Sequence, residues 1–270
     1  MIIENCLEIV SCLLVITIME ISLAAEKIAH LGPMPITNAM LTSWIGSFLL
    51  ILVALLATRK MKLIPSGIQN VFEFAVEALY NTANSVIDDE KVTRKVFPLV
   101  ATLFLFIVFN NWLGLVPGVG TIGLHHFVNG KEALIPLFRS GNADLNMTIA
   151  LAVTTVIAVQ IFGIVVIGVA KYGKKFFNFS NPIAFFVGIL ELIGEISRII
   201  SFSFRLFGNV FAGEVLLTVI AFIVPYFAPL PFYGLELFVG FIQALVFTML
   251  ALAFIKSAIT DHEAEHAEAH

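Results

Sequence analysis

Residues 182–220 read PIAFFVGILELIGEISRIISFSFRLFGNVFAGEVLLTVI. These 39 residues contain no proline after Pro182, so a single helix can run through all of them. With a rise of about 1.5 Å per residue the helix would be about 58 Å long, whereas the hydrocarbon layer of a bilayer is about 30 Å thick. We therefore expect a helix that is either strongly tilted or broken.

The composition of the whole chain is that of a membrane protein. Hydrophobic residues make up 59% and charged residues 13% of its 270 residues, whereas about 25% of a soluble domain is charged. The apolar residues fall in blocks, which predicts an all-α polytopic membrane protein embedded in a lipid bilayer. Basic residues lie in short segments that flank apolar runs, so nothing indicates nucleic-acid binding. Cys6 and Cys12 share one apolar stretch, and no cofactor or metal site is expected.

The remaining apolar runs predict four more spans and one amphipathic helix. Pro65-Ser66-Gly67 begins a segment, ending near Asp88, in which apolar residues recur at helical spacing. We expect this segment to lie along the membrane interface. Pro225, Pro229 and Pro231 form a turn, so the long helix and the last helix pair as a tilted hairpin. Five transmembrane crossings result when the long helix is added to Leu41–Ala57, Val96–Val116, Met147–Ala170 and Phe232–Ile259.

The two ends of the chain differ from the part between them. Residues 1–30 carry a stretch, Ile9–Ile18, that is too short to span, and we expect an outer-side or interfacial segment. Residues 31–260 form the predicted membrane domain. Residues 261–270 form a charged cytoplasmic tail, whose terminal position and glutamates favour a solvated segment over a histidine metal site.

The basic residues beside the spans predict the orientation. Ten of them fall on one side of the membrane, and three fall on the other: Lys27, Lys131 and Arg139. Because cytoplasmic loops carry the excess of Lys and Arg, the N-terminus should face outside and the C-terminus the cytoplasm. No Arg-rich transit segment is visible, which favours a bacterial plasma membrane over an organelle.

Arg205 stands alone within the apolar run of the long helix. A charge near the bilayer centre costs at least a few kcal/mol, so it is expected to serve a function. Glu191, Arg198 and Arg205 are seven residues apart and lie within about 40° of one another on the helix. Glu195 precedes Arg198 by three residues, which allows a local ion pair. Arg205 lies about 21 Å beyond Glu191 along the axis.

A second polar group follows on the outer side. Asn209 and Glu214 lie beyond Arg205, and the last helix contributes Glu236 and Gln243, which are seven residues apart. Antiparallel pairing would bring Gln243 to the level of Arg205 and Glu236 to that of Glu214. Two polar approaches then flank a cation with no acid at its own level. Such a cation separates two half-channels if a matching carboxylate comes from another subunit.

Two other interpretations compete with this one. A self-contained ion transporter or channel would be expected to show internal repeats and broken helices, and no repeat is visible in this sequence. In a structural scaffold the polar residues would only join helices, which leaves the intramembrane Arg and Glu side chains unexplained. Four further polar residues support a structural role and a functional role about equally. They are Asn110, Asn111, Gln160 and Ser197.

Five motifs resemble subunit a of the F-type ATP synthases, the stator subunit beside the rotating c-ring. They occur in the family's order between Ile36 and Ile259, and the arginine motif is the most specific. Residues 1–30 have no counterpart in the resemblance. The motifs are Pro65–Asn70, Asn111–Pro117, Ala143–Thr148, Ser203–Glu214 and Phe241–Ala244.

The resemblance implies roles for particular residues. Arg205 would be the essential arginine that faces the c-ring carboxylate, with Gln243 near it. Position 236 holds His or Glu within the family, so Glu236 fits. The outer half-channel would include Glu214, Glu236, Asn209, Asn146 and Asp144. The cytoplasmic half-channel would include Glu191, Glu195 and Arg198.

The resemblance also implies the function and the partners. The chain would be the proton-translocating stator subunit, whose two offset half-channels pass H⁺ to and from the c-ring carboxylates and couple ion flow to rotation and ATP synthesis. Its partners would be the c-ring, the subunit b stator stalk and the rest of the enzyme. ATP would form on other subunits, since no Gly-Lys-Ser/Thr phosphate loop occurs here. The c subunit mainly decides between H⁺ and Na⁺.

Overall fold

A computed structural model describes residues 25–31, 34–59, 67–116, 123–128, 131–169, 172–173, 182–224 and 227–260. The predictions for the N-terminal stretch up to residue 24, including Ile9–Ile18, and for the tail after residue 260 lie outside these residues. The helices are α2 (Asn38–Thr58), α3 (Ile68–Ile87), α4 (Glu90–Gly114), α5 (Leu145–Ile167), α7 (Pro182–Ile223) and α8 (Pro229–Thr260). All but α3 are long and apolar enough to cross a membrane. The predicted all-α polytopic fold with five such helices is therefore confirmed.

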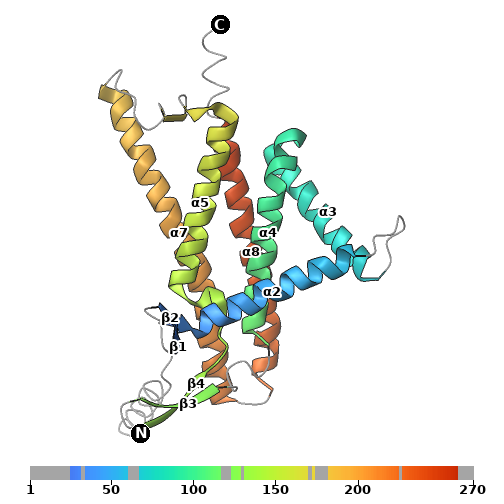
Figure 1. Cartoon of the computed structure of the whole chain (residues 1–270), viewed down its shortest axis with the longest axis vertical. Coiled ribbons are helices and arrows are strands. Elements are labelled where there is room, and N and C mark those ends of the chain that lie inside the picture. The colour runs from blue at the N-terminus through green and yellow to red at the C-terminus, as the bar shows by residue number, and fades with distance from the viewer. Residues whose placement is uncertain are drawn as a thin grey trace, which may run out of the picture.

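Helix α7 is continuous over 42 residues, a length of about 63 Å. Figure 1 shows it descending obliquely while α4, α5 and α8 run side by side. Between the two expectations of a tilted and a broken helix, the structure selects the tilted one. Helix α8 turns back over 32 residues and packs against α7, which completes the hairpin.

One face of α7 packs into the core, and the opposite face is uncovered. Phe202 and Leu206 are buried against Ala244, Phe247 and other residues of α8, α4 and α5. The rings of Phe202 and Phe247 lie 4.6 Å apart, edge to face. This packing fixes the rotation of α7 about its axis, and so decides which of its polar residues point outward.

Helix α4 begins earlier than its apolar run predicts. Its first residue is Glu90, whereas the predicted span starts at Val96. The Asp89 carboxylate accepts hydrogen bonds from the backbone amides of Lys91, at 2.7 Å, and Val92, at 3.3 Å. This N-cap satisfies amides that would otherwise lack partners, so the helix extends past the apolar segment into a charged turn.

Helix α3 matches the predicted amphipathic segment. It ends at Ile87, and the residue that follows, Asp88, has a left-handed φ of 63°. Its second half packs through Leu79, Ala83 and Ile87, of which the last two join a buried cluster with residues of α4 and α8. Of the acidic residues in its first half, Glu77 is exposed and Glu73 is partly buried. Its location at a membrane interface stays a prediction.

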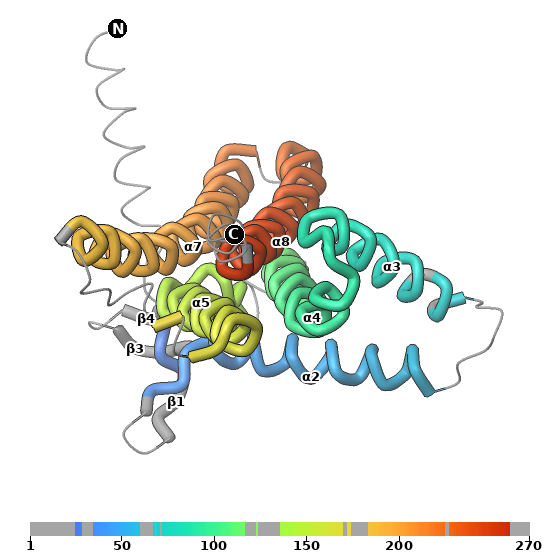
Figure 2. The backbone as a smooth tube through the Cα atoms, turned by 90° about the horizontal axis from the view of Figure 1, so that it is seen from above, coloured from blue at the N-terminus to red at the C-terminus, as the bar shows by residue number. Residues whose placement is uncertain are grey.

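Helix α2 has the expected length but an unexpected direction. Seen from above, it runs across the molecule while α4, α5 and α8 are viewed nearly end-on (Figure 2). Its buried residues are confined to its first half. Beyond Gly46, large side chains such as Phe48 and Leu55 are more than half exposed. Apolarity predicts that this helix meets lipid, but does not predict its angle to the others.

Two β-hairpins and a short turn were not predicted. Strand β1 (Lys27–Leu31) pairs with β2 (Met34–Thr37), and β3 (Gly123–Val128) pairs with β4 (Lys131–Pro136), both antiparallel. After β4 the chain enters the bundle and forms the 3-10 turn η1 (Gly141–Ala143), which contacts α2, α4, α5 and α7. A side chain at Gly141 would overlap the Ser43 hydroxyl, so this close approach requires glycine.

Candidate functional site

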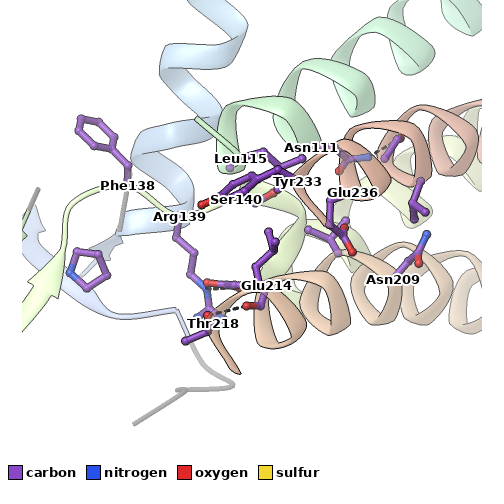
Figure 3. A pocket seen from close by; sticks show the side chains of 16 residues that line it. Asn111, Leu115, Phe138, Arg139, Ser140, Asn209, Glu214, Thr218, Tyr233 and Glu236 are labelled. Atoms are coloured by element: carbon purple, nitrogen blue, oxygen red, sulfur yellow. Dashed lines mark hydrogen bonds and ion pairs between the residues drawn. The ribbon is translucent and has the colours of Figure 1, made fainter. Parts of the chain in front are cut away.

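A cavity of about 180 Å³, lined by both apolar and polar side chains, lies between the segment after β4 and helices α4, α7 and α8. Figure 3 shows its polar side chains converging from these elements. Charged residues in its lining are Arg139, Glu214 and Glu236, and Asn111 and Asn209 also border it. The cavity therefore gathers the carboxylates that the sequence placed at one level of the last two helices.

Arg139 and Glu214 form an ion pair at this cavity. The Arg139 Nε lies 3.1 Å from both carboxylate oxygens of Glu214, and the guanidinium carbon lies 6.0 Å from the centre of the Phe211 ring. Arg139 is only 7% exposed. Sequence reasoning counted Arg139 only as an outer-side cation, because nothing in its local pattern indicates a partner 75 residues away.

Glu236 lies beside Glu214 in the lining of the same cavity. Its carboxylate rests directly against Gly213, where any side chain would overlap it. In the described part of the chain, Glu236 has neither an ion pair nor a hydrogen bond. The two carboxylates of the cavity therefore have opposite surroundings, one bound to a cation and one unpaired.

Asn209 and Gln243 connect the cavity to the middle of the hairpin. The Asn209 side-chain amide donates to Gln243 Oε1 over 3.2 Å. Gln243 is buried, and its own amide nitrogen has no hydrogen-bond partner in the described structure. The structure thus brings together Gln243 of α8 and Asn209, which borders the cavity and lies one turn of α7 from Arg205.

Arg205 lies on the uncovered face of α7. Its guanidinium forms no ion pair with a carboxylate among the described residues and donates a hydrogen bond to the Ser201 hydroxyl over 3.1 Å. Both Ser201 and Arg205 are exposed, and a side chain at Gly208 would meet nothing within 4 Å. The cation therefore projects from the bundle, away from the packed core.

Glu191, Glu195 and Arg198, the trio that the sequence predicts on the cytoplasmic side, all lie on α7. Arg198 pairs with Glu195, as the three-residue spacing predicts, and its Nη2 lies 3.7 Å from Glu191. The guanidinium carbon also lies 4.6 Å from the centre of the Phe254 ring on α8. Glu195 is buried, and its Oε2 has no hydrogen-bond partner in the described structure. One buried carboxylate oxygen is thus left to accept a proton or a water molecule.

Tyr172 is a neighbour of this trio that sequence reasoning missed. Its hydroxyl donates to the Gln160 side chain, and its ring lies against Gly163. Burial, and after it the charges of the Glu195 and Glu191 carboxylates, together raise the pKa of the Tyr172 phenol to about 12. The phenol therefore stays protonated beside these acids at neutral pH.

Asp144 and Asn146 lie elsewhere than the cavity. The Asp144 carboxylate caps α5 by accepting from the Asn146 backbone amide over 3.1 Å and from its side-chain amide over 3.3 Å. Neither residue borders the cavity that holds Glu214 and Glu236. Their contacts are those of a helix cap, so the structure does not group them with the other polar residues of the outer side.

The sequence profile of the family described as ATP synthase A chain matches residues 40–256. The chain is 36% identical to the ATP synthase subunit a of Moorella thermoacetica over 87% of its own length and 97% of the relative's. It is 36% identical to the subunit of Gloeobacter violaceus over 88% and 90% of the two chains. The Campylobacter jejuni subunit is 35% identical over 79% and 86%.

Proposed function

This chain belongs to the ATP synthase A chain family, and on that premise we propose that it is the proton-translocating stator subunit of an F-type ATP synthase. It is a multi-pass membrane protein with several apolar helices. Within the assembled enzyme, it provides two offset half-channels that pass H⁺ to and from the carboxylates of a c-ring. Other partners are the subunit b stator stalk and the remainder of the enzyme.

The observation that carries this proposal is the exposed, uncompensated Arg205. A guanidinium remains protonated in any protein, and its placement in an apolar helix is expensive. The only interaction it makes within the described residues is with a neutral hydroxyl. A carboxylate on an adjacent subunit would supply the missing anion.

The face that carries Arg205 suits a closely packed partner helix. Its neighbours along the helix are the small residues Gly194, Ser197, Ser201, Gly208 and Ala212. Small residues allow helix backbones to approach closely in membranes. The c-ring helix that bears the ion-binding carboxylate fits this face, and its carboxylate would meet Arg205 as the ring turns.

The two polar groups supply the two half-channels. The cavity with Glu214, Glu236 and Asn209 serves the outer side, and the trio of Glu191, Glu195 and Arg198 serves the cytoplasmic side. A c-ring carboxylate must be neutralised before it moves through lipid, because burying the bare anion is prohibitive. Arg205 favours the ionised form when the carboxylate returns, and so promotes release of the proton and prevents a leak between the two sides.

The membrane potential drives the cycle. Each proton that crosses contributes about 2.3 kcal/mol per 100 mV. Because entrance and exit lie at different positions along the tilted hairpin, a proton must ride around the ring to leave. Ion flow is thereby converted to rotation, and other subunits use the rotation to make ATP.

The orientation follows from the distribution of basic residues. The start of α4 and the end of α8 lie at one end of the molecule, opposite the β3–β4 hairpin and the α7–α8 turn (Figure 1). That end carries Lys91, Arg94, Lys95 and Lys256. By the positive-inside rule it faces the cytoplasm of a bacterium, with the N-terminus outside and the C-terminus inside.

The decisive experiment is ATP-driven proton pumping in inverted membrane vesicles. Arg205→Ala should abolish acidification at normal amounts of assembled enzyme. Arg94→Ala is the matched control, since Arg94 pairs with Glu90 on an exposed turn, and such pairs contribute little. Pumping by the Arg205→Ala enzyme would refute the proposal. Proton transport by the purified chain alone would instead favour a self-contained transporter, although the unbroken α7 and α8 differ from the broken helices of that class.

Contact with the ring is tested by cysteine cross-linking. Gly208→Cys should form a disulfide with a cysteine beside the c-ring carboxylate, because position 208 is exposed on the Arg205 face. Leu206→Cys, two residues away and fully buried, is the control and should not react. Equal cross-linking at both positions would place the ring elsewhere.

A further inference from the structure

We propose that Asn111 of α4, oriented by Asn142, is a positioning residue that holds α8 where Glu236 can serve the outer cavity. The inference rests on the proposed function, because it gives a cause for the place of one carboxyl of the outer half-channel. The sequence supports a structural and a functional role for Asn111 about equally. The hydrogen bonds of its side chain connect these two roles.

Two consecutive side chains of α4 donate hydrogen bonds to the backbone of α8. Asn111 Nδ2 donates to the Gly240 carbonyl over 2.9 Å, and Trp112 Nε1 donates to the Leu237 carbonyl over 3.1 Å. A carbonyl that accepts from the amide one turn further along its own helix still has a second lone pair. These two bonds are therefore added to the hydrogen bonds of α8 and replace none of them.

Asn142 fixes the orientation of the Asn111 side-chain amide. Its Nδ2 donates to Asn111 Oδ1 over 2.8 Å and to the Ile107 carbonyl over 3.4 Å. Both asparagines are buried. A backbone carbonyl can only accept a hydrogen bond, so the carbonyls of Ile107 and Gly240 require both amides to point in this direction. Asn142 thereby turns the nitrogen of Asn111 towards α8.

Much of the remaining contact between α4 and α8 is apolar. Ile107 shares a buried cluster with Ala244 and Phe247. Such contacts are non-directional, so they hold two helices together without fixing one along or about its axis. A hydrogen bond, in contrast, requires a narrow range of distance and angle. Gly240 allows the close approach, since a Cβ there would lie 3.1 Å from the Asn111 Cβ.

Glu236 depends on this placement of α8. Its carboxyl has neither an ion pair nor a hydrogen bond in the described structure, so the backbone that carries it decides where it lies. Glu236 is one turn before Gly240 and rests against Gly213 of α7, and both Glu236 and Asn111 border the outer cavity (Figure 3). A shift of α8 by one residue would move it by about 1.5 Å and turn it by about 100°. The carboxyl would then leave Gly213, and the Asn111 bond opposes that movement.

The test is ATP synthesis by inverted vesicles after an acid–base jump, with the lumen pH varied and each rate normalised to the amount of assembled subunit. The outer side of the membrane faces the lumen, so the lumen pH at half-maximal rate reports on proton entry. Asn111→Leu should lower the maximal rate by about tenfold or more, because a displacement of about 1 Å can cost that much, and should shift the half-maximal lumen pH. The subunit should still accumulate, since the Gly240 carbonyl keeps its helical partner and Asn142 keeps the Ile107 carbonyl.

Asn110→Leu is the matched control. Asn110 is also buried, and its side-chain amide donates to the Phe106 carbonyl of its own helix over 2.9 Å rather than to α8. Its rate should stay within about twofold of the wild type, with an unchanged half-maximal lumen pH. An equal shift in both variants would overturn the proposal, because the profile would then respond to the polarity of α4 in general. Both variants retain all titratable residues that line the cavity, which are Arg139, Glu214, Tyr233 and Glu236.

Asn142→Leu tests the orienting role. It should shift the half-maximal lumen pH in the same direction as Asn111→Leu but by less, and it should add no further shift to the Asn111→Leu enzyme. Additive shifts would show that the two residues act independently and would refute the orienting role.

A wild-type rate per subunit and a wild-type half-maximal lumen pH in Asn111→Leu would reduce Asn111 to a joint between helices and overturn the proposal. Each of these outcomes is compatible with a loss of pumping in Arg205→Ala. Failure of this inference is therefore distinguishable from failure of the proposed function.

Discussion

Arg139, which contacts helix α7, and Arg205, which belongs to it, have opposite surroundings. Arg139 reaches the helix from a distant segment, is almost fully buried and is paired with Glu214. Arg205 belongs to the helix, is exposed, and contacts only a hydroxyl among the described residues. The comparison teaches that a charge satisfied within the chain organises the chain, whereas a charge left unsatisfied at membrane depth awaits another subunit.

The sharpest way to break this comparison is to measure stability and function for both arginines. Arg139→Ala leaves Glu214 without its cation and removes a buried side chain; because Glu214 is 37% exposed, the purified chain should be destabilised by about 1–3 kcal/mol, less than for a fully buried pair. Arg205→Ala should change the stability by less than about 0.5 kcal/mol and still abolish pumping. Thermal unfolding in detergent, run beside the vesicle assay, gives both quantities. Equal destabilisation by the two variants would remove the distinction.

Gly213 and Gly208, on opposite sides of α7, allow the same comparison to be made with added side-chain volume. Gly213→Val should overlap the Glu236 carboxyl and reduce both the amount of folded subunit and its pumping. Gly208→Val meets nothing within the chain, so the subunit should accumulate normally and lose function because the side chain obstructs the c-ring. Immunoblots and vesicle acidification separate these outcomes. Loss of folded protein in Gly208→Val would show that this face is packed within the chain.

A smaller effect is expected for the trio of Glu191, Glu195 and Arg198. Loss of one carboxylate there still leaves Arg198 beside the other. Glu195→Gln removes the nearer partner of Arg198 but leaves Glu191 at 3.7 Å. Pumping should fall severalfold without being abolished, because one carboxylate still serves the route. Glu191→Gln is the companion variant, and the pair of variants together should lose more than either alone. Wild-type rates in the doubly substituted enzyme would exclude these acids from the proton path.

The smallest effect concerns Tyr172 at alkaline pH. Its pKa rises from 10.0 to about 12 on folding, so between these values the folded chain retains a proton that the unfolded chain has lost. Stability should therefore be unaffected below about pH 10 and decline as the pH rises towards 12. Tyr172→Phe should lack this contribution to the alkaline decline. Thermal unfolding of both proteins across this range, with phenolate absorbance as a second readout, checks the sign.

Much of α7 was predictable because helical periodicity relates residues that are close in sequence. Seven-residue spacing places Glu191, Arg198 and Arg205 on one side, and the ion pair of Arg198 with Glu195 follows from a spacing of three. The length of the run requires tilt or a break. The functional roles of these residues remain predictions that the experiments above address.

The partners of Arg139 were not predictable in the same way. Its position after a hairpin gives no sign of the segment that enters the bundle, and Glu214 is 75 residues further along the chain. Asp144 illustrates the converse. A conspicuous acid in a recognisable motif turned out to cap α5, a role that depends only on its nearest neighbours.

By itself, the sequence determined the class of protein, the number of apolar helices, the length of α7 and the isolation of Arg205 within it. These properties follow from hydrophobic transfer and from helix geometry, which act over a few neighbouring residues. Only the tertiary structure decided that α7 tilts without breaking, that α2 lies across the bundle, and that Arg139 meets Glu214 while Arg205 meets no acid within the described chain. Those outcomes depend on how distant segments pack around one another, and local spacing carries no information about that packing.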